Sequence, residues 1–266
     1  MRSAASGRYG GAVTLAHDLT GDGPTVLLLH STAGDRRMWE PQVPALVAAG
    51  YRVLRCDLRG FGGTPAPDAP YNDADDVTGL LDALAVDRTA VIASSGGGQV
   101  AQELAARDPG RVTALALLCT AMAGHEPSPA LQAFFEREDA LLAAGDLTAA
   151  TELNVHTWLG PHADEQTRDL ARVMQRHAFG IQSEAYVDVE PIEVPYDVAT
   201  ITAPVLLVSG DHDLPDFREI AVHLAGRLPQ ARHVPLPWAG HLPSMERPDE
   251  TNRLLLDFLT ATVPPR

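Results

Sequence analysis

Short apolar runs alternate with amphipathic stretches over the first 120 residues of the chain. The run at 25–30 is mainly aliphatic, which is typical of a strand buried on both faces of a sheet. Val77, Leu80, Leu81 and Leu84 recur at helical spacing and predict one apolar helix face. Strands are predicted at 25–30, 51–56, 89–94 and 112–119, a hairpin near 12–17, and further helices ending at Gly50 and spanning 97–107.

From about 121 to 200 this alternation stops, and helical patterns follow around 134–144, 147–158 and 165–179. The alternation resumes with a strand at 205–209, a helix at 217–227, a strand at 232–236 and a helix at 249–260. Strands alternating with helices predict an α/β fold with a doubly wound, mostly parallel sheet. We therefore expect an α/β core formed by 1–120 and 201–266, and an inserted helical cap at 121–200.

The charge balance argues against phosphate-bearing partners. The 266 residues include 35 acidic and 20 basic side chains, a formal net charge of −15, which disfavours nucleic acid and anionic membrane surfaces. All 20 basic residues are Arg, so chemistry that requires a lysine amine, such as a Schiff base or a phosphate-loop lysine, is excluded.

Cys56 and Cys119 each lie in an apolar run, so no disulfide scaffold is expected. The sequence shows neither a secretory signal pattern nor an apolar run of about 18 residues. We therefore expect a cytoplasmic protein that does not enter membranes. Its oligomeric state stays open, with a homo-oligomer among the alternatives.

The segment VIASSGGGQVA at 91–101 places two serines and three glycines between a predicted strand and a predicted helix. A nucleophilic serine on such a sharp turn requires small residues two positions before and two positions after it. Ala93 and Gly97 meet this requirement for Ser95, whereas Ser94 would place the branched Ile92 against the helix. The segment therefore favours Ser95 as a nucleophile.

Two other interpretations of this segment stay open. The pattern Gly96-x-Gly98-x-x-Ala101 matches a dinucleotide-binding turn, but the next predicted strand ends without the required carboxylate. A phosphate loop lacks its lysine, so no cofactor is expected. The third interpretation is a tight connection without chemistry.

A nucleophilic serine requires an imidazole to accept its proton and a carboxylate to orient that imidazole. The strand at 205–209 leads into Gly210-Asp211-His212-Asp213, and the strand at 232–236 leads into a loop with His241. Asp211 and Asp213 have the same parity along the strand, so the pleat does not separate them. No second cluster at ligand spacing accompanies these residues, and no metal site is expected.

These motifs resemble the α/β-hydrolase superfamily over nearly the whole chain outside the cap. Beside the serine turn, VLLLHSTAGDRRMW resembles the oxyanion loop, RCDLRGFGGT the strand-loop motif, and LLVSGDHD and WAGHLPSMERP the acid and histidine loops. The order serine, acid, histidine is the order of that fold. Within it, the short cap and the SxGGxxxQELA turn look most like enol-lactonases and small-molecule esterases.

The resemblance implies that Ser95 is the nucleophile, His241 the general base and acid, and Asp213 the orienting carboxylate. It also implies an oxyanion hole formed by the N–H groups of Thr32 and Gly96. The chain departs from the family pattern at two positions, where Ala93 replaces an elbow glycine and Ser31 replaces a glycine beside the oxyanion loop.

The expected activity is hydrolysis of a small-molecule ester or lactone through an acyl-enzyme, without a cofactor. A C–C bond hydrolase or a perhydrolase would keep the same triad, and a hydrolase-like ligand receptor would keep the pocket with little turnover. Fold similarity alone does not fix the substrate. Residues expected to line or flank the pocket are His30, Ser31, Trp39, Phe134, Phe135, Trp158 and Trp238.

Overall fold

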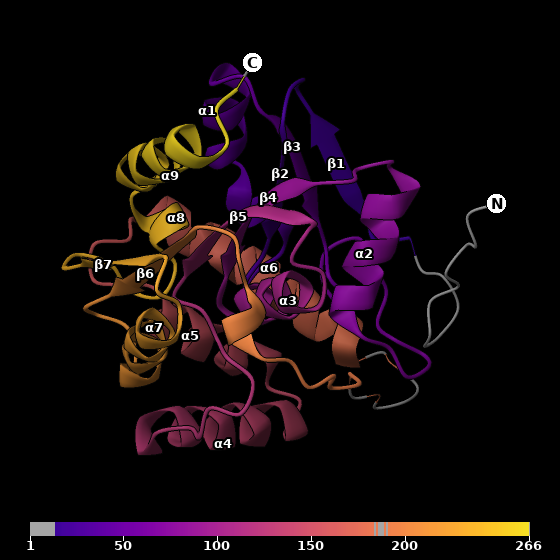
Figure 1. Ribbon diagram of the computed structural model, residues 1–266. Coiled ribbons are helices and arrows are strands. Elements are labelled where there is room, and N and C mark those ends of the chain that lie inside the picture. Colours follow the sequence, from indigo (N-terminus) through magenta and orange to yellow (C-terminus); the bar gives the residue numbers. More distant parts are fainter. Residues whose placement is uncertain (1–13, 184, 186–188, 190, 266) are drawn as a thin grey trace.

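The computed structural model describes residues 14–183, 185, 189 and 191–265. Within these ranges a seven-stranded sheet has the order β1-β3-β2-β4-β5-β6-β7, and every neighbouring pair is parallel except β1 with β3. This confirms the predicted doubly wound, mostly parallel α/β sheet (Figure 1). The strands are β1 (His17–Thr20), β2 (Thr25–Leu29), β3 (Arg52–Cys56), β4 (Thr89–Ser94), β5 (Val112–Leu118), β6 (Val205–Gly210) and β7 (Ala231–Leu236).

Residues 12 and 13 of the predicted N-terminal hairpin lie outside the described residues. The described part of that segment leads into β1, which pairs antiparallel with β3 so that His17 lies opposite Cys56. The chain then returns through β2 to the interior of the sheet. β1 is therefore an edge strand beside β3 and does not pair with β2.

Helices cover both faces of the sheet and create two apolar cores. Successive strand residues point to opposite faces, so Leu27 and Leu29 lie in one core while Val26 and Leu28 lie in the other. Burial on both faces explains the continuous apolar runs of the central strands. One face is covered by α2 (Asp73–Ala83), α3 (Ser95–Arg107) and α7 (Pro215–Arg227), and the other by α1 (Gln42–Ala48) and α9 (Pro248–Thr262).

Three helices lie between β5 and β6 and form the insertion that the sequence predicts as a cap. They are α4 (Pro129–Ala143), α5 (Leu147–Trp158) and α6 (Glu165–Ser183), drawn below and behind the sheet in Figure 1. α4 begins earlier than predicted, because Ser128 caps it by accepting a hydrogen bond from Leu131 N and Pro129 suits its first turn. Apolar residues of all three helices pack onto the core that contains α9.

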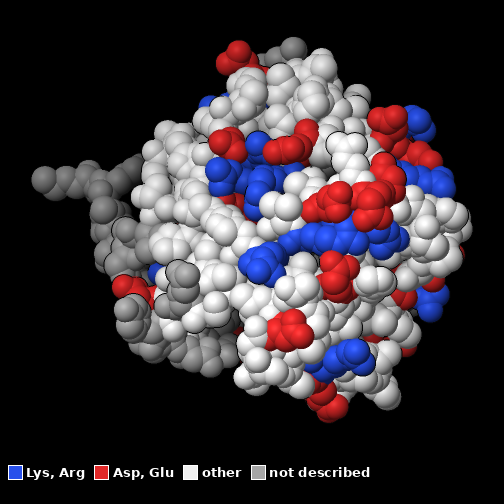
Figure 2. All heavy atoms as spheres, turned by 180° about the vertical axis from the view of Figure 1, so that it is seen from behind, with Lys and Arg blue, Asp and Glu red and all other residues white. Residues whose placement is uncertain are grey.

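The surface carries acidic and basic side chains in close alternation. On the face shown in Figure 2, a band of arginine side chains crosses the middle of the view, with Asp and Glu side chains on either side of it. No helix among the described residues is long and apolar enough to cross a membrane. Ion pairs such as Arg172 with Glu152 and Glu165 account for part of this alternation.

The first prediction concerns the close approach of α3 to β2 at Gly97. A Cβ atom at Gly97 would lie 2.3 Å from the His30 carbonyl oxygen, whereas a Cβ at Gly79 in α2 would meet nothing within 4 Å. Gly97→Ala should therefore lower the free energy of unfolding by about 1–3 kcal/mol. Gly79→Ala should raise it by up to about 1 kcal/mol, because alanine favours helix. Chemical denaturation measures both, and a Gly97→Ala protein as stable as wild type would contradict the close approach.

Candidate active site

Ser95 lies where a strand meets a helix without any connecting loop. β4 ends at Ser94 and α3 begins at Ser95, whose φ of +52° is in the left-handed region. Such a backbone is strained for a residue with a side chain and persists only where the surrounding structure fixes it. Ser94 is fully buried and its hydroxyl has no partner among the described residues, whereas Ser95 lines a cavity. The geometry thus favours Ser95 over Ser94.

His241 is hydrogen-bonded to one of the two candidate carboxylates. Its Nδ1 lies 2.7 Å from Asp213 Oδ2, and both side chains are buried. Asp211 is exposed, so the structure distinguishes the two aspartates that the sequence pattern leaves equivalent. An ionised Asp213 accepts a hydrogen bond from Nδ1–H, which leaves Nε2 of a neutral ring free to act as a base.

Aromatic rings hold the His241 imidazole in place. Its ring centroid lies 4.6 Å from that of Trp158 in the cap and 4.1 Å from that of Phe217 in α7. Trp158 is itself fixed by a hydrogen bond from its Nε1 to Asn154 Oδ1, 2.8 Å away. These contacts restrict rotation of the imidazole and keep one side of it away from water.

The backbone around His241 is held by a buried carboxylate. Glu246, in the short helix α8 (Pro243–Glu246) that the sequence analysis did not predict, accepts hydrogen bonds from Gly240 N and Leu242 N at 2.9–3.1 Å. Burial raises the pKa of Glu246 above its ordinary value. His241 N donates to the Trp158 carbonyl oxygen, 2.9 Å away. The histidine loop is therefore fixed from both the core and the cap.

Ser95 and His241 line one cavity of about 290 Å³. This volume is near the lower end of the roughly 300–1,000 Å³ typical of ligand sites. The hydrogen bonds between described residues do not include one from Ser95 Oγ to His241 Nε2. Hydrogen bonds of this kind are often long before substrate binds. A larger cavity of about 490 Å³, between loop 62–68 and α6, contains neither residue.

The two predicted oxyanion donors, Thr32 and Gly96, also line the cavity. Gly96 is the second residue of α3, where backbone N–H groups have no acceptor within the helix. A Cβ at Gly96 would lie 2.7 Å from Thr32 Cγ2, so the two residues are in close contact. Ser31 is absent from the described residues with positive φ, so this loop forms without the glycine of the family pattern.

Hydrogen bonds of His30 fix the start of this loop. Its Nδ1 lies 2.9 Å from the Ser31 carbonyl oxygen, and its Nε2 accepts a hydrogen bond from Leu58 N at 2.9 Å. A carbonyl can only accept and an N–H can only donate, so the ring is the neutral Nδ1–H tautomer. Complete burial lowers the pKa of His30 and favours the same state.

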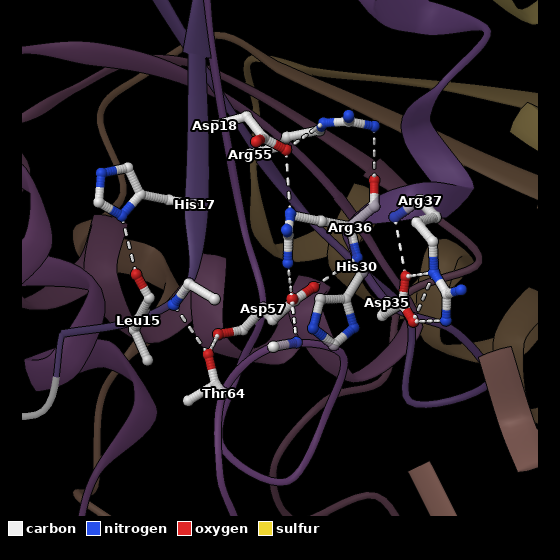
Figure 3. Close-up of polar contacts among 12 residues, drawn as sticks. Leu15, His17, Asp18, His30, Asp35, Arg36, Arg37, Arg55, Asp57 and Thr64 are labelled. Atoms are coloured by element: carbon white, nitrogen blue, oxygen red, sulfur yellow. Dashed lines mark hydrogen bonds and ion pairs between the residues drawn. The ribbon is translucent and has the colours of Figure 1, made fainter. Parts of the chain in front are cut away.

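Asp57 connects the strand-loop motif to the segment that follows the oxyanion loop (Figure 3). Its carboxylate accepts hydrogen bonds from Arg36 N at 2.8 Å and from Gly63 N at 2.7 Å, and it forms an ion pair with the Arg36 guanidinium. Arg36 also contacts Asp18 at 2.9 Å. This network, in which the Asp57 side chain is buried, holds residues that follow the carboxyl ends of β2 and β3 together and supports the geometry of the oxyanion loop.

Of the residues expected near the pocket, Ser31, Phe135 and Trp158 line the 290 Å³ cavity. The other four do not line it. His30 and Trp39 are completely buried below the oxyanion loop, and Phe134 packs behind the cavity with its ring centroid 4.6 Å from that of Trp158. The Trp238 ring instead lies against the Arg247 guanidinium, with its centroid 5.0 Å from Arg247 Cζ. Whether an expected residue lines the cavity depends on which face of its helix it occupies or on the path of its loop. Composition reveals neither.

Several cavity residues were missed by the sequence analysis. They come from the start of the cap and from α7, and they are Met122, His125, Pro127, Leu131, Phe217 and Ile220. Phe217 and Ile220 are three positions apart on α7, so they share one helix face. That spacing was visible in the sequence, but nothing in it indicated that this face meets the cap.

One group among the described residues has the composition of a metal site. The ligand atoms of Cys119, Asp213 and His241 lie within 4.8 Å of one another, and all three residues are buried. Burial raises the pKa of the Cys119 thiol well above its ordinary value, which disfavours the thiolate that metals bind. Asp213 and His241 already bond to each other, so the arrangement fits an imidazole–carboxylate pair better than a metal centre.

Comparison with known proteins identifies the family of the chain. The sequence matches the family described as "Alpha/beta hydrolase family" over residues 26–254, and the chain belongs to that family. It is similar to the structure of the enol-lactonase from Burkholderia xenovorans LB400, with a TM-score of 0.76 and 29% identity over 95% of this chain and 99% of the other.

Two further relatives cover most of the chain. A thermophilic esterase from Thermogutta terrifontis, in its malate-bound structure, has a TM-score of 0.75 and 25% identity over 93% of each chain. The second is RutD of Variovorax paradoxus (strain S110), a protein to which carbamate hydrolysis is provisionally assigned. It is 31% identical over 92% of this chain and 94% of its own length. The three relatives are named for different reactions, namely the hydrolysis of an enol-lactone, an ester and a carbamate.

The second prediction concerns Glu246. Its carboxylate faces backbone N–H groups, so Glu246→Gln would turn an amide –NH₂ toward one of these donors. The variant should lose about 1–3 kcal/mol of stability through the unpaired groups, and its hydrolytic turnover should fall with the displaced histidine loop. The control is Glu250→Gln, because the Glu250 side chain is 41% exposed and forms an ion pair with Arg247, 3.0 Å away, rather than holding backbone N–H groups. Thermal unfolding and ester hydrolysis should separate the two variants; equal behaviour would contradict the proposed positioning role.

Proposed function

We propose that the chain is a serine hydrolase that cleaves a small carboxylic ester or lactone through an acyl-enzyme intermediate. The observation that carries the proposal is one cavity lined by both Ser95 and His241, with His241 Nδ1 bonded to Asp213 at 2.7 Å. Because Nδ1–H donates to Asp213, the proton acceptor of the neutral ring is Nε2. The family membership and the elbow backbone of Ser95 support the same roles.

In the acylation step, Ser95 Oγ attacks the carbonyl carbon of the substrate while His241 Nε2 takes the hydroxyl proton. The carbonyl oxygen becomes an oxyanion that the N–H groups of Gly96 and Thr32 stabilise. When the bond to the alkoxy oxygen breaks, His241 returns its proton to that oxygen. The alcohol leaves from an ester, or stays attached as the far end of an opened lactone.

In the deacylation step, water attacks the acyl carbon of the Ser95 ester and His241 accepts one of its protons. The same backbone donors stabilise the second oxyanion. Collapse releases the carboxylic acid, and the proton on His241 returns to Ser95 Oγ. Asp213 stabilises the imidazolium in both steps without becoming protonated. Water is the only reactant besides the substrate, so the cycle requires no cofactor.

The cavity restricts the class of substrate. Most of its walls are apolar, including Leu131, Phe217 and Ile220, and no arginine is among the described residues that line it. A site of about 290 Å³ with such walls fits a small molecule with limited charge better than a polymer. Similarity to an enol-lactonase and to an esterase supports a lactone or an ester in particular.

A carbamate is the second candidate substrate, because the 31% identical relative from V. paradoxus is named for that reaction. Its carbonyl would occupy the same position relative to Ser95. A panel containing a lactone, an aryl ester, a carbamate, a C–C bond substrate and hydrogen peroxide as an alternative nucleophile separates these activities. A ligand receptor would hydrolyse none of them.

The third prediction tests the nucleophile. Ser95→Ala should lower kcat for p-nitrophenyl acetate by about 10⁴-fold or more, because the oxygen that attacks the carbonyl is gone. Ser94→Ala, one residue earlier and fully buried, should leave kcat within about threefold of wild type. Release of p-nitrophenol measures both rates. Equal loss in the two variants, or none in Ser95→Ala, would contradict the assignment.

A further inference from the structure

A second imidazole–carboxylate pair reaches the cavity from the wall formed by the start of the cap. His125 follows β5, and its Nε2 lies 3.0 Å from Oδ1 of Asp216 in the first turn of α7. The Asp216 side chain is fully buried, whereas the His125 side chain is 19% exposed and lines the cavity with Ser95 and His241. The acyl-transfer cycle uses one imidazole, His241, so this pair has no part in it.

Asp216 fixes the orientation and tautomer of His125. Its carboxylate also accepts hydrogen bonds from Ser128 N at 2.7 Å and Ser128 Oγ at 2.6 Å. Burial alone would raise the pKa of Asp216, but the hydrogen bonds from Ser128 and His125 outweigh it and hold the pKa below its ordinary value. An ionised carboxylate only accepts, so His125 donates through Nε2. In a neutral ring Nδ1 then carries a lone pair that accepts a hydrogen bond.

The remaining cavity walls offer few groups that could recognise a polar substituent. Ser95, His241 and the donors at Thr32 and Gly96 are committed to the reacting carbonyl. The hydroxyls of Ser31 and Thr32 belong to the oxyanion loop beside these donors, and the Ser31 hydroxyl accepts a hydrogen bond from Ala33 N at 3.1 Å. The other lining side chains are apolar or have their polar atom bonded elsewhere, as Trp158 does. Among the described lining residues away from the oxyanion loop and the reacting centre, His125 is therefore the one whose side chain can recognise a second polar group on the substrate.

The geometry points to His125 as a specificity-determining residue that accepts, through Nδ1, a hydrogen bond from a hydroxyl on the non-reacting part of the substrate. This inference rests on the proposed ester or lactone hydrolysis and narrows its substrate to hydroxylated esters or lactones. The roles of the two histidines differ accordingly. His241 moves protons at the reacting centre, whereas His125 contacts the substrate away from it. Asp216 acts through His125 and is a positioning residue.

Three γ-butyrolactones that differ in one substituent test the inference: the γ-methyl, γ-hydroxymethyl and γ-carboxy compounds. kcat/KM is measured for each with wild type, His125→Leu and the control His156→Leu, whose imidazole is 74% exposed on the cap. For each protein, kcat/KM for the hydroxymethyl lactone is divided by kcat/KM for the methyl lactone. Comparing this ratio between proteins cancels the intrinsic difference in reactivity between the two lactones. His125→Leu should lower this ratio about tenfold, the factor expected from one net hydrogen bond.

Three results would overturn the inference: an equal loss on all three lactones, an unchanged ratio, or a wild-type preference for the carboxy compound that depends on His125. Thermal unfolding of each variant identifies any loss that comes from misfolding. Calorimetric binding of the same lactones to Ser95→Ala, with and without His125→Leu, reports recognition without turnover. If wild type hydrolyses neither the lactones nor p-nitrophenyl acetate, the proposed function fails, while the calorimetric ratio still decides the role of His125.

Discussion

The left-handed backbone of Ser95 is the constraint on which the rest of the site depends. It lets α3 begin directly after β4, so the serine side chain projects from the carboxyl end of a central strand into the cavity. The helix then passes so close to the chain at the ends of β2 and β5 that neither Gly97, against His30, nor Gly98, against Thr120, has room for a Cβ. The strain at one residue is offset by the packing of the two cores around it.

The histidine is placed by parts of the chain that are distant in sequence. Asp213 follows β6, Glu246 belongs to α8, and the Trp158 carbonyl lies at the end of a cap helix. The insertion between β5 and β6 therefore contributes to the placement of His241 as well as to the cavity wall. Trp158 participates in both, since its ring packs on the imidazole and lines the cavity. A change in cap position would alter the base and the substrate site together.

Sequence patterns predicted those parts of the structure that depend on the size and the apolar spacing of neighbouring residues. The buried strands, the helix in 147–158 and the choice of Ser95 over Ser94 each follow from residue size and apolar spacing. Asp211 and Asp213 could not be separated that way, because only the path of the loop after β6 buries one and exposes the other. Trp39 and Trp238 were expected near the pocket for their aromatic character, but long-range packing directs them elsewhere.

Covalent labelling with a fluorophosphonate, followed by mass spectrometry of the digested protein, tests directly whether Ser95 is an activated nucleophile. An activated serine in an intact site attacks this reagent, whereas an ordinary hydroxyl does not. We expect one adduct per folded chain, located on Ser95, and none on protein unfolded before the reagent is added. A folded chain that remains unlabelled, or that carries the adduct on Ser94 or on another residue, would contradict it.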